Sequence, residues 1–193
     1  MNFAEVVNEV RLILKRPELD NQIKRQVNAA ISLFCYDTDF ARDFVEESVS
    51  IDGAEYSQAF AISSFTRFRK FVYLKRGGTN KYLRRLSINE MAKGCADRGD
   101  KFYEVGTNVN IYLKQYADTL DVGYMSYPPL LTGASGANTF WLIEMAPYMV
   151  IDKAAALLFQ QIGDEVSMRT HNTQAIETYA TFRKDNILSA VYP

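Results

Sequence analysis

The sequence of 193 residues predicts an α+β fold, with two N-terminal helices and two C-terminal helices packed as a helical bundle and a β-rich lobe inserted between them. Apolar residues recur at helical spacing near both ends of the chain, whereas residues 44–127 are rich in β-branched and aromatic side chains and carry frequent turn signals. Terminal helices that pack together can share one core. We therefore expect a helical hairpin at 1–38, a β-rich lobe at 39–130, long helices at 138–188 that pack on the hairpin, and a tail at 189–193.

The first 38 residues predict the helical hairpin. Apolar side chains recur at spacings of three and four from Phe3 to Leu14, and Asn2 is placed to cap this helix. Pro17 ends the first helix and suits the first turn of the second. The second helix has an apolar stripe formed by Ile23, Val27, Ala30, Ile31 and Phe34.

The first half of the lobe predicts strands joined by tight turns. Asp52-Gly53 is a hairpin-type turn. Strict alternation along the next strand puts Phe68 and Leu74 on one side and Phe71 on the other. A five-residue turn then leads back into a strand at 82–86; its residues are Arg76, Gly77, Gly78, Thr79 and Asn80.

The rest of the chain predicts one short helix, further strands and the C-terminal helices. Ser87 and Glu90 form a capping box at the start of a helix over 87–96. Strands follow at 102–105, 109–113 and 120–127, which gives five or six strands in the lobe. A long helix is expected from about Thr139 to Ile162 with Asn138 as its cap, then a break at Gly163-Asp164 and a last helix over 165–188.

The composition excludes several classes of site. The chain has one His and two Cys, too few for a Cys/His zinc cluster, and His171 alone cannot serve a mechanism that needs two histidines. We expect Cys35 and Cys95 to be plain thiols. Without a secretory signal or a long apolar stretch, the chain is expected to be soluble, made in a reducing cytosol and not bound to membranes. The 24 Phe and Tyr residues favour large buried surfaces, including interfaces.

Candidate catalytic groups have simpler structural explanations. The glycines at 77 and 78 join two strands rather than a strand and a helix, so they do not form a phosphate-binding loop. Residues 133–137 lack the last glycine of a nucleophile elbow. The carboxylate pairs Asp118/Asp121 and Asp164/Glu165 fit a loop between strands and a helix start. We therefore expect no enzyme activity, no cofactor and no metal site.

Two adjacent segments carry opposite charge. Residues 37–55 hold seven acids and one base, a net charge of −6, and residues 67–98 hold ten bases and two acids, a net charge of +8. These segments can face each other, a neighbouring subunit or a nucleic acid. An alternative function is therefore a nucleic-acid-binding β domain using residues 67–85, where bases alternate with aromatics, although no intact ribonucleoprotein motif is present.

Several segments in this order resemble the head-to-tail adaptor (connector, head-completion) proteins of tailed bacteriophages. The resemblance covers nearly the whole chain, although residues 56–62 lack the Pro and Asp that family members usually carry. It rests on the Arg16-Pro17 junction, Phe102–Val105 with Val109–Leu113, Val122–Leu131, Asn138–Leu142, Ala146-Pro147-Tyr148 and Gly163-Asp164.

The resemblance implies a structural virion protein at the head–tail interface, assembled in the host cytoplasm. Such adaptors form rings, often homododecamers, beneath the portal protein; they extend the DNA channel and offer a platform to the tail. The implied partners are the portal protein, a tail or nozzle protein, further copies of the chain, and genomic DNA that passes without sequence recognition.

Two segments are the candidate binding sites. In the family the C-terminal tail typically reaches into the portal, which here implicates Ile187, Leu188, Ser189, Ala190, Val191, Tyr192 and Pro193. The hairpin turn is our candidate for a contact with a neighbouring subunit or with the tail, through Arg76, Gly77, Gly78, Thr79 and Asn80.

Overall fold

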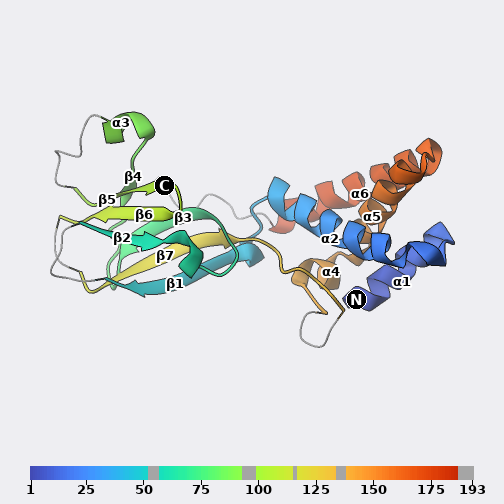
Figure 1. Cartoon of the computed structure of the whole chain (residues 1–193), viewed down its shortest axis with the longest axis horizontal. Helices are drawn as coiled ribbons and strands as arrows, with labels where there is room; N and C mark the ends of the chain where they lie inside the picture. Colours follow the sequence, from blue (N-terminus) through green and yellow to red (C-terminus); the bar gives the residue numbers. More distant parts are fainter. Residues whose placement is uncertain (52–56, 93–98, 115–116, 134–137, 187–193) are drawn as a thin grey trace. The chain divides into compact units, whose positions relative to one another are not determined.

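The chain forms two compact units, one helical and one built of β-strands (Figure 1). The computed structural model describes residues 1–51, 57–92, 99–114, 117–133 and 138–186. The helical unit combines Met1–Asp43 with the stretch that begins at Tyr127, and the β unit spans Phe44–Ser126. The predicted α+β arrangement, in which helices from both ends of the chain pack together and flank an insertion of strands, is confirmed.

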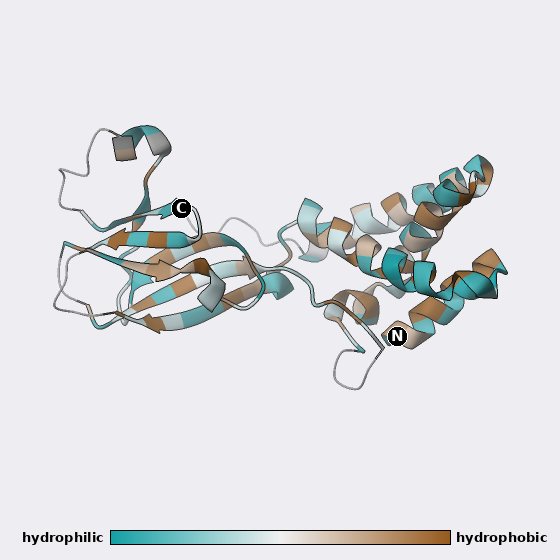
Figure 2. Ribbon diagram, viewed as in Figure 1, coloured by the Kyte–Doolittle hydropathy of each residue, from teal (hydrophilic) through white to brown (hydrophobic). Residues whose placement is uncertain are grey.

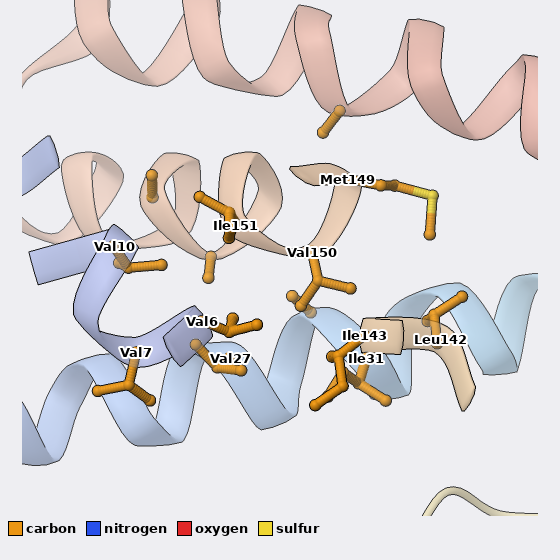
Figure 3. Close-up of a cluster of buried hydrophobic side chains, with 14 of the residues drawn as sticks. Val6, Val7, Val10, Val27, Ile31, Leu142, Ile143, Met149, Val150 and Ile151 are labelled. Atoms are coloured by element: carbon orange, nitrogen blue, oxygen red, sulfur yellow. The ribbon is translucent and has the colours of Figure 1, made fainter. Parts of the chain in front are cut away.

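The helical unit is built around helix α5 (Pro147–Ile162). Its neighbours are α1 (Phe3–Leu14), α2 (Asp20–Asp37), the short α4 (Trp141–Met145) and α6 (Glu165–Asn186). Figure 3 shows Val150 and Ile151 of α5 among side chains of α1, α2 and α4. The predicted stripes of α1 and α2 are both buried there, and Figure 2 shows brown apolar positions alternating with teal polar ones along these helices.

The predicted cap of the first helix is confirmed and extended. The Asn2 side chain accepts a hydrogen bond from the Glu5 N–H at 3.0 Å, while the Glu5 carboxylate accepts from the Asn2 N–H at 2.9 Å. This reciprocal pair satisfies two N–H groups that lack partners inside the helix. A short 3₁₀ turn, Pro17–Leu19, then leads into α2.

The single long helix predicted from Thr139 to Ile162 is wrong, because the chain breaks it into α4 and α5 at Ala146. Pro147 has no N–H to continue the helix, and its ring would clash with the carbonyl four residues earlier. Asn138 is not the cap either. Phe140 precedes α4 without a side-chain cap, and the Asn138 carbonyl accepts from the Phe3 N–H at 2.7 Å.

The predicted break between the last two helices is confirmed. Gly163 ends α5 in the left-handed conformation, with φ of 79°, a geometry that glycine adopts without steric cost. Asp164 then caps α6, since its carboxylate accepts hydrogen bonds from the Ser167 N–H at 3.1 Å and from the Ser167 hydroxyl at 2.7 Å. These bonds lower the pKa of Asp164.

None of the helices in the described part of the chain has the length and apolar character of a membrane-spanning segment.

The β unit consists of two sheets. The three-stranded sheet is antiparallel, with the order β1 (Phe44–Ser50), β7 (Thr119–Ser126), β3 (Phe68–Arg76). The four-stranded sheet has the order β2 (Ser57–Ala61), β6 (Asn108–Tyr112), β5 (Lys101–Val105), β4 (Arg84–Arg85), and β4 runs parallel to β5. Side chains from both sheets form one apolar core that includes Leu74, Phe102, Ile111, Leu120 and Tyr124.

Two predictions for the strands are wrong. Residues 52 and 53 lie outside the described residues, but the strands on either side of them, β1 and β2, belong to different sheets, so they form no hairpin. Strict alternation in β3 also fails, because register shifts follow Phe68 and Phe71. These irregularities let Phe68, Phe71 and Leu74 contact the same core, whereas Tyr73 packs against Phe44.

The capping box of the predicted helix at 87–96 is confirmed, and α3 (Ile88–Ala92) follows it; residues 93–96 lie outside the described residues. Ser87 and Glu90 exchange hydrogen bonds, with the Ser87 N–H donating to the Glu90 carboxylate at 2.8 Å and the Glu90 N–H donating to the Ser87 hydroxyl at 3.3 Å. The Arg84 guanidinium donates to the same carboxylate.

This arrangement gives a pH prediction for Glu90. The hydrogen bond from the Ser87 backbone, then those from Arg84 and the Ser87 hydroxyl, favour the charged form and lower its pKa from 4.5 to about 2. The contribution of the cap to α3 is therefore complete above pH 4.5 and lost as the pH falls toward 2. An NMR titration of the Glu90 carboxyl should show a midpoint near pH 2. The midpoint should rise in Ser87→Ala and stay unchanged in Asn89→Ala; a midpoint at the ordinary value in the unaltered chain would refute this reading.

Candidate functional site

The hairpin turn proposed as a contact site lies at the end of β3. Its backbone closes through hydrogen bonds from the Arg76 N–H to the Lys81 carbonyl at 3.1 Å and from the Thr79 N–H to the Arg76 carbonyl at 3.1 Å. The Thr79 hydroxyl also donates to the Arg76 carbonyl at 2.9 Å. Gly78 has a φ of 67°, in the left-handed region. Gly78, Thr79 and Asn80 are exposed and form the outward part of the turn.

The other two residues of the turn face the protein. The Arg76 guanidinium lies 2.6 Å from the Asp100 carboxylate, and both side chains are largely buried. Gly77 donates its N–H to the Thr119 carbonyl at 2.9 Å. A Cβ atom at Gly77 would lie 1.9 Å from the Thr119 hydroxyl oxygen, so only glycine fits there without a shift. Arg76 and Gly77 therefore anchor the turn, and a contact surface would consist of residues 78–80.

The other predicted site, Ile187–Pro193, lies outside the described residues. The structure places its attachment point, because α6 is described through Asn186 and carries its C-terminal half against the rest of the helical unit. Phe182, one turn before this point, stacks on Trp141 with ring centroids 6.1 Å apart. The indole N–H of Trp141 in turn donates to the buried carboxylate of Asp43 at 2.8 Å. The base of the tail segment is thus firmly held.

A groove beside this attachment point was not predicted from the sequence. It has a volume of about 610 Å³, and we call it the α5–α6 groove. Its lining combines the junction of α4 and α5 with the C-terminal half of α6, through Met145, Ala146, Pro147, Tyr148, Met149, Glu177, Thr178, Thr181 and Phe182. Met145 and Tyr148 are 46% and 68% exposed, so the groove presents two large apolar side chains to solvent. The only feature of the sequence that indicates this groove is the Ala-Pro-Tyr segment, because its proline interrupts the helix.

The oppositely charged segments partly satisfy each other inside the β unit. Lys75 of β3 lies 3.0 Å from the Glu46 carboxylate of β1 and 3.7 Å from that of Asp121 on β7. Hydrogen bonds from the Tyr73 hydroxyl and from Lys75 lower the pKa of Glu46. Arg85 pairs with Glu104 at 2.7 Å. Part of the positive charge therefore stabilises the sheets themselves rather than a partner.

The alternative nucleic-acid site loses most of its aromatic platform. Phe71 and Tyr73 are buried, and Phe68 is partly buried against the same core as Phe71. Tyr82 remains 43% exposed and packs edge-on against Tyr73. Because bases stack on accessible ring faces, buried rings cannot serve a single strand. The alternation of bases and aromatics along β3 reflects core packing.

The candidate catalytic groups have structural partners. The His171 imidazole lies 2.8 Å from the Asp152 carboxylate and stacks on the Phe159 ring. These two contacts join α6 to α5. Asp121 lies within β7 rather than in a loop, where it accepts a hydrogen bond from the Ser48 hydroxyl at 2.7 Å. Among the described residues, no group of three or more His, Cys, Asp or Glu side chains could hold a metal ion.

Comparison with known proteins identifies one family. A family model described as "SU10 adaptor protein" matches residues 1–187, nearly the whole chain. The match includes both ends of the helical unit as well as the β unit between them. A search of curated proteins gave no match.

Proposed function

This chain belongs to the SU10 adaptor protein family, and we propose that it joins the head of a tailed phage to its tail. In this role, copies of the chain assemble into a ring of twelve beneath the portal protein. The ring extends the DNA channel, and the genome passes through without sequence recognition. A tail or nozzle protein docks on the other side. The family match over residues 1–187 is the observation that carries this proposal.

We assign two contacts in this assembly. Residues Ile187–Pro193 bind the portal protein, supported by their composition, because every residue except Ser189 is apolar or aromatic. Apolar side chains that leave water on binding provide most of the free energy of association. The exposed part of the hairpin turn, Gly78, Thr79 and Asn80, contacts a neighbouring subunit or the tail. The ion pair between Arg76 and Asp100 supports this assignment, since it holds the turn in one conformation before any partner binds.

The portal contact is tested with a chain that ends at Asn186. We expect its affinity for the portal protein of the same phage to fall by at least about 30-fold, the effect of losing one binding hot spot of about 2 kcal/mol. Surface plasmon resonance against immobilised portal measures the affinity. A second variant replaces residues 187–193 with a Gly/Ser segment of equal length, which removes the apolar side chains but keeps the length, and should lose affinity equally.

The control is a chain in which Gly78, Thr79 and Asn80 are replaced by three other residues that are compatible with a tight turn between two strands. This control should keep its portal affinity. Unchanged portal affinity in both tail variants would show that the tail does not contribute to the portal contact.

Electron microscopy of portal mixed with the full chain tests the ring itself and counts its subunits. Tight, salt-dependent DNA binding by the isolated monomer, with no ring on the portal, would favour the nucleic-acid alternative instead.

A further inference from the structure

Leu130 projects from the helical unit on a constrained segment. Its side chain is 72% exposed, whereas that of the next residue, Leu131, is 2% exposed. The Asn28 side chain donates to the Leu131 carbonyl at 2.9 Å and accepts from the Leu131 N–H at 2.8 Å. Pro128 and Pro129 come directly before Leu130, and their rings fix their own φ angles. Leu130 is therefore held outward before any partner binds, which lowers the entropic cost of a contact.

The surface beside Leu130 carries positive charge. It forms a depression of about 490 Å³ over the N-terminal half of α2, which we call the Leu130 surface. Its lining residues are Asn21, Lys24, Arg25, Asn28, Leu130 and Leu131. Lys24 pairs with Asp20 at 2.7 Å, whereas the exposed Arg25 forms no ion pair with any other described residue. This surface thus combines a large apolar side chain with one uncompensated positive charge.

The α5–α6 groove has the complementary properties. Met145 and Tyr148 expose large apolar side chains to it, and Ala146 and Phe182 provide further apolar lining. Exposed apolar surface of this kind commonly marks an interaction site. Glu177 is the one charged residue among the described residues that line the groove. The groove and the Leu130 surface are therefore both apolar and opposite in charge, which favours contact between them.

The two surfaces lie too far apart to meet within one chain. The Leu130 surface covers residues 21–28 of α2, roughly 14 to 24 Å along the helix axis from Asp37, where α2 ends. The groove lies beside that end, because the ring of its Phe182 contacts the ring of Phe40, with centroids 5.9 Å apart. A leucine side chain cannot span this distance, so a contact between the two surfaces requires two copies of the chain.

We propose that Leu130 of one copy docks in the α5–α6 groove of the next copy, with Arg25 of the first beside Glu177 of the second. Each copy offers both surfaces and the two surfaces differ, so the contact is heterologous and repeats from copy to copy, as in a ring. The inference rests on the proposed function, in which copies of the chain assemble beneath the portal protein, and it names the contact between them.

Disulfide cross-linking tests this contact. In a chain carrying Cys95→Ser, one variant combines Leu130→Cys with Met145→Cys, and the matched control combines Leu130→Cys with Val166→Cys. Cysteine keeps a small apolar side chain at both contact positions. Val166 is 78% exposed and lies on α6 outside the groove, eleven residues before Glu177.

With portal protein of the same phage present, the first pair should link chains into a ladder of disulfide-bonded oligomers. We expect this reaction to be at least about ten times faster than in the control, because docking raises the effective concentration of the two thiols. A mixture of chains that carry one cysteine each, at 130 or at 145, should give linked dimers with one chain of each kind. Non-reducing electrophoresis with mass spectrometry identifies these products.

Charge reversal in chains without introduced cysteines provides a second measurement. Arg25→Glu and Glu177→Arg should each lower the yield of rings on portal several-fold, counted by electron microscopy, because each places like charges in the contact. Both changes in one chain restore opposite charges and should recover most of the yield. Arg16→Glu makes the same change of charge outside both surfaces and should leave the yield unchanged. Loss in both single variants without recovery in the double variant would contradict the pairing.

The outcomes separate this contact from the proposed function. Rings on portal without cross-links above the control rate, or disulfides within one chain, would overturn the contact and leave the proposed function standing. Cross-linked oligomers at high protein concentration without rings on portal would support the contact and refute the proposed function. If neither rings nor cross-links form, both fail.

Discussion

Replacing Phe40 with alanine should lower the free energy of unfolding of the helical unit by about 3–5 kcal/mol, the usual cost of truncating a fully buried aromatic side chain. Phe40 is 0% exposed. Its ring meets that of Trp141 edge-on, with centroids 5.1 Å apart, and also contacts Tyr179 and Phe182. The substitution therefore opens a cavity where the segment after α2 meets α4 and α6.

Urea unfolding followed by far-UV circular dichroism measures this loss, because α-helices dominate that signal. Phe40→Leu keeps much of the buried volume and should lose less than half as much stability. Tyr36→Ala truncates an aromatic ring four residues earlier that is 74% exposed, and should change stability by no more than about 0.5 kcal/mol. A loss below about 1 kcal/mol for Phe40→Ala would mean that the cluster repacks around the cavity.

Arg76→Ala should lower the free energy of unfolding of the β unit by about 3–5 kcal/mol, the typical cost of removing one partner of a buried ion pair. The Arg76 and Asp100 side chains are 8% and 15% exposed. Asp100 also accepts a hydrogen bond from the Lys114 N–H at 2.8 Å, which helps to hold its carboxylate beside Arg76. The variant leaves a negative charge without its compensating cation.

A double variant separates this cost from the loss of arginine packing. Arg76→Met with Asp100→Asn removes both charges, while the amide oxygen can still accept from the Lys114 N–H, so most of the stability should return. Amide hydrogen exchange of β3 and β5 follows the β unit specifically. If the double variant were as unstable as Arg76→Ala, the effect would come from packing rather than from the unpaired charge.

The helices could be predicted from the sequence because their signals are local. Stripes at spacings of three and four, the Asn2 and Ser87 caps, and the Gly163 break each depend on residues within a turn or two. The break at Pro147 is equally local. The pattern of apolar residues suggested a continuous helix there, yet the missing N–H and the ring of proline decide the outcome.

The sheets could not be predicted in detail, because strand pairing depends on residues far apart in the chain. β1 pairs with β7, whose Met125 is the partner of Phe44, and β2 pairs with β6. No single residue of β3 indicates its register shifts. These shifts place Phe71 on the same side as Phe68 and Leu74. The α5–α6 groove was missed for the same reason, since its two walls come from residues more than 25 positions apart.

The pairing of Phe44 with Met125 has a consequence for how the protein is made. The β unit begins and finishes on neighbouring strands, and all its strands have been synthesised once Ser126 has left the ribosome. The helical unit, in contrast, cannot close its core until α5 and α6 have been translated, because α1 and α2 have only each other until then. We therefore expect the insertion to fold first during translation, while the N-terminal hairpin waits for the last quarter of the chain.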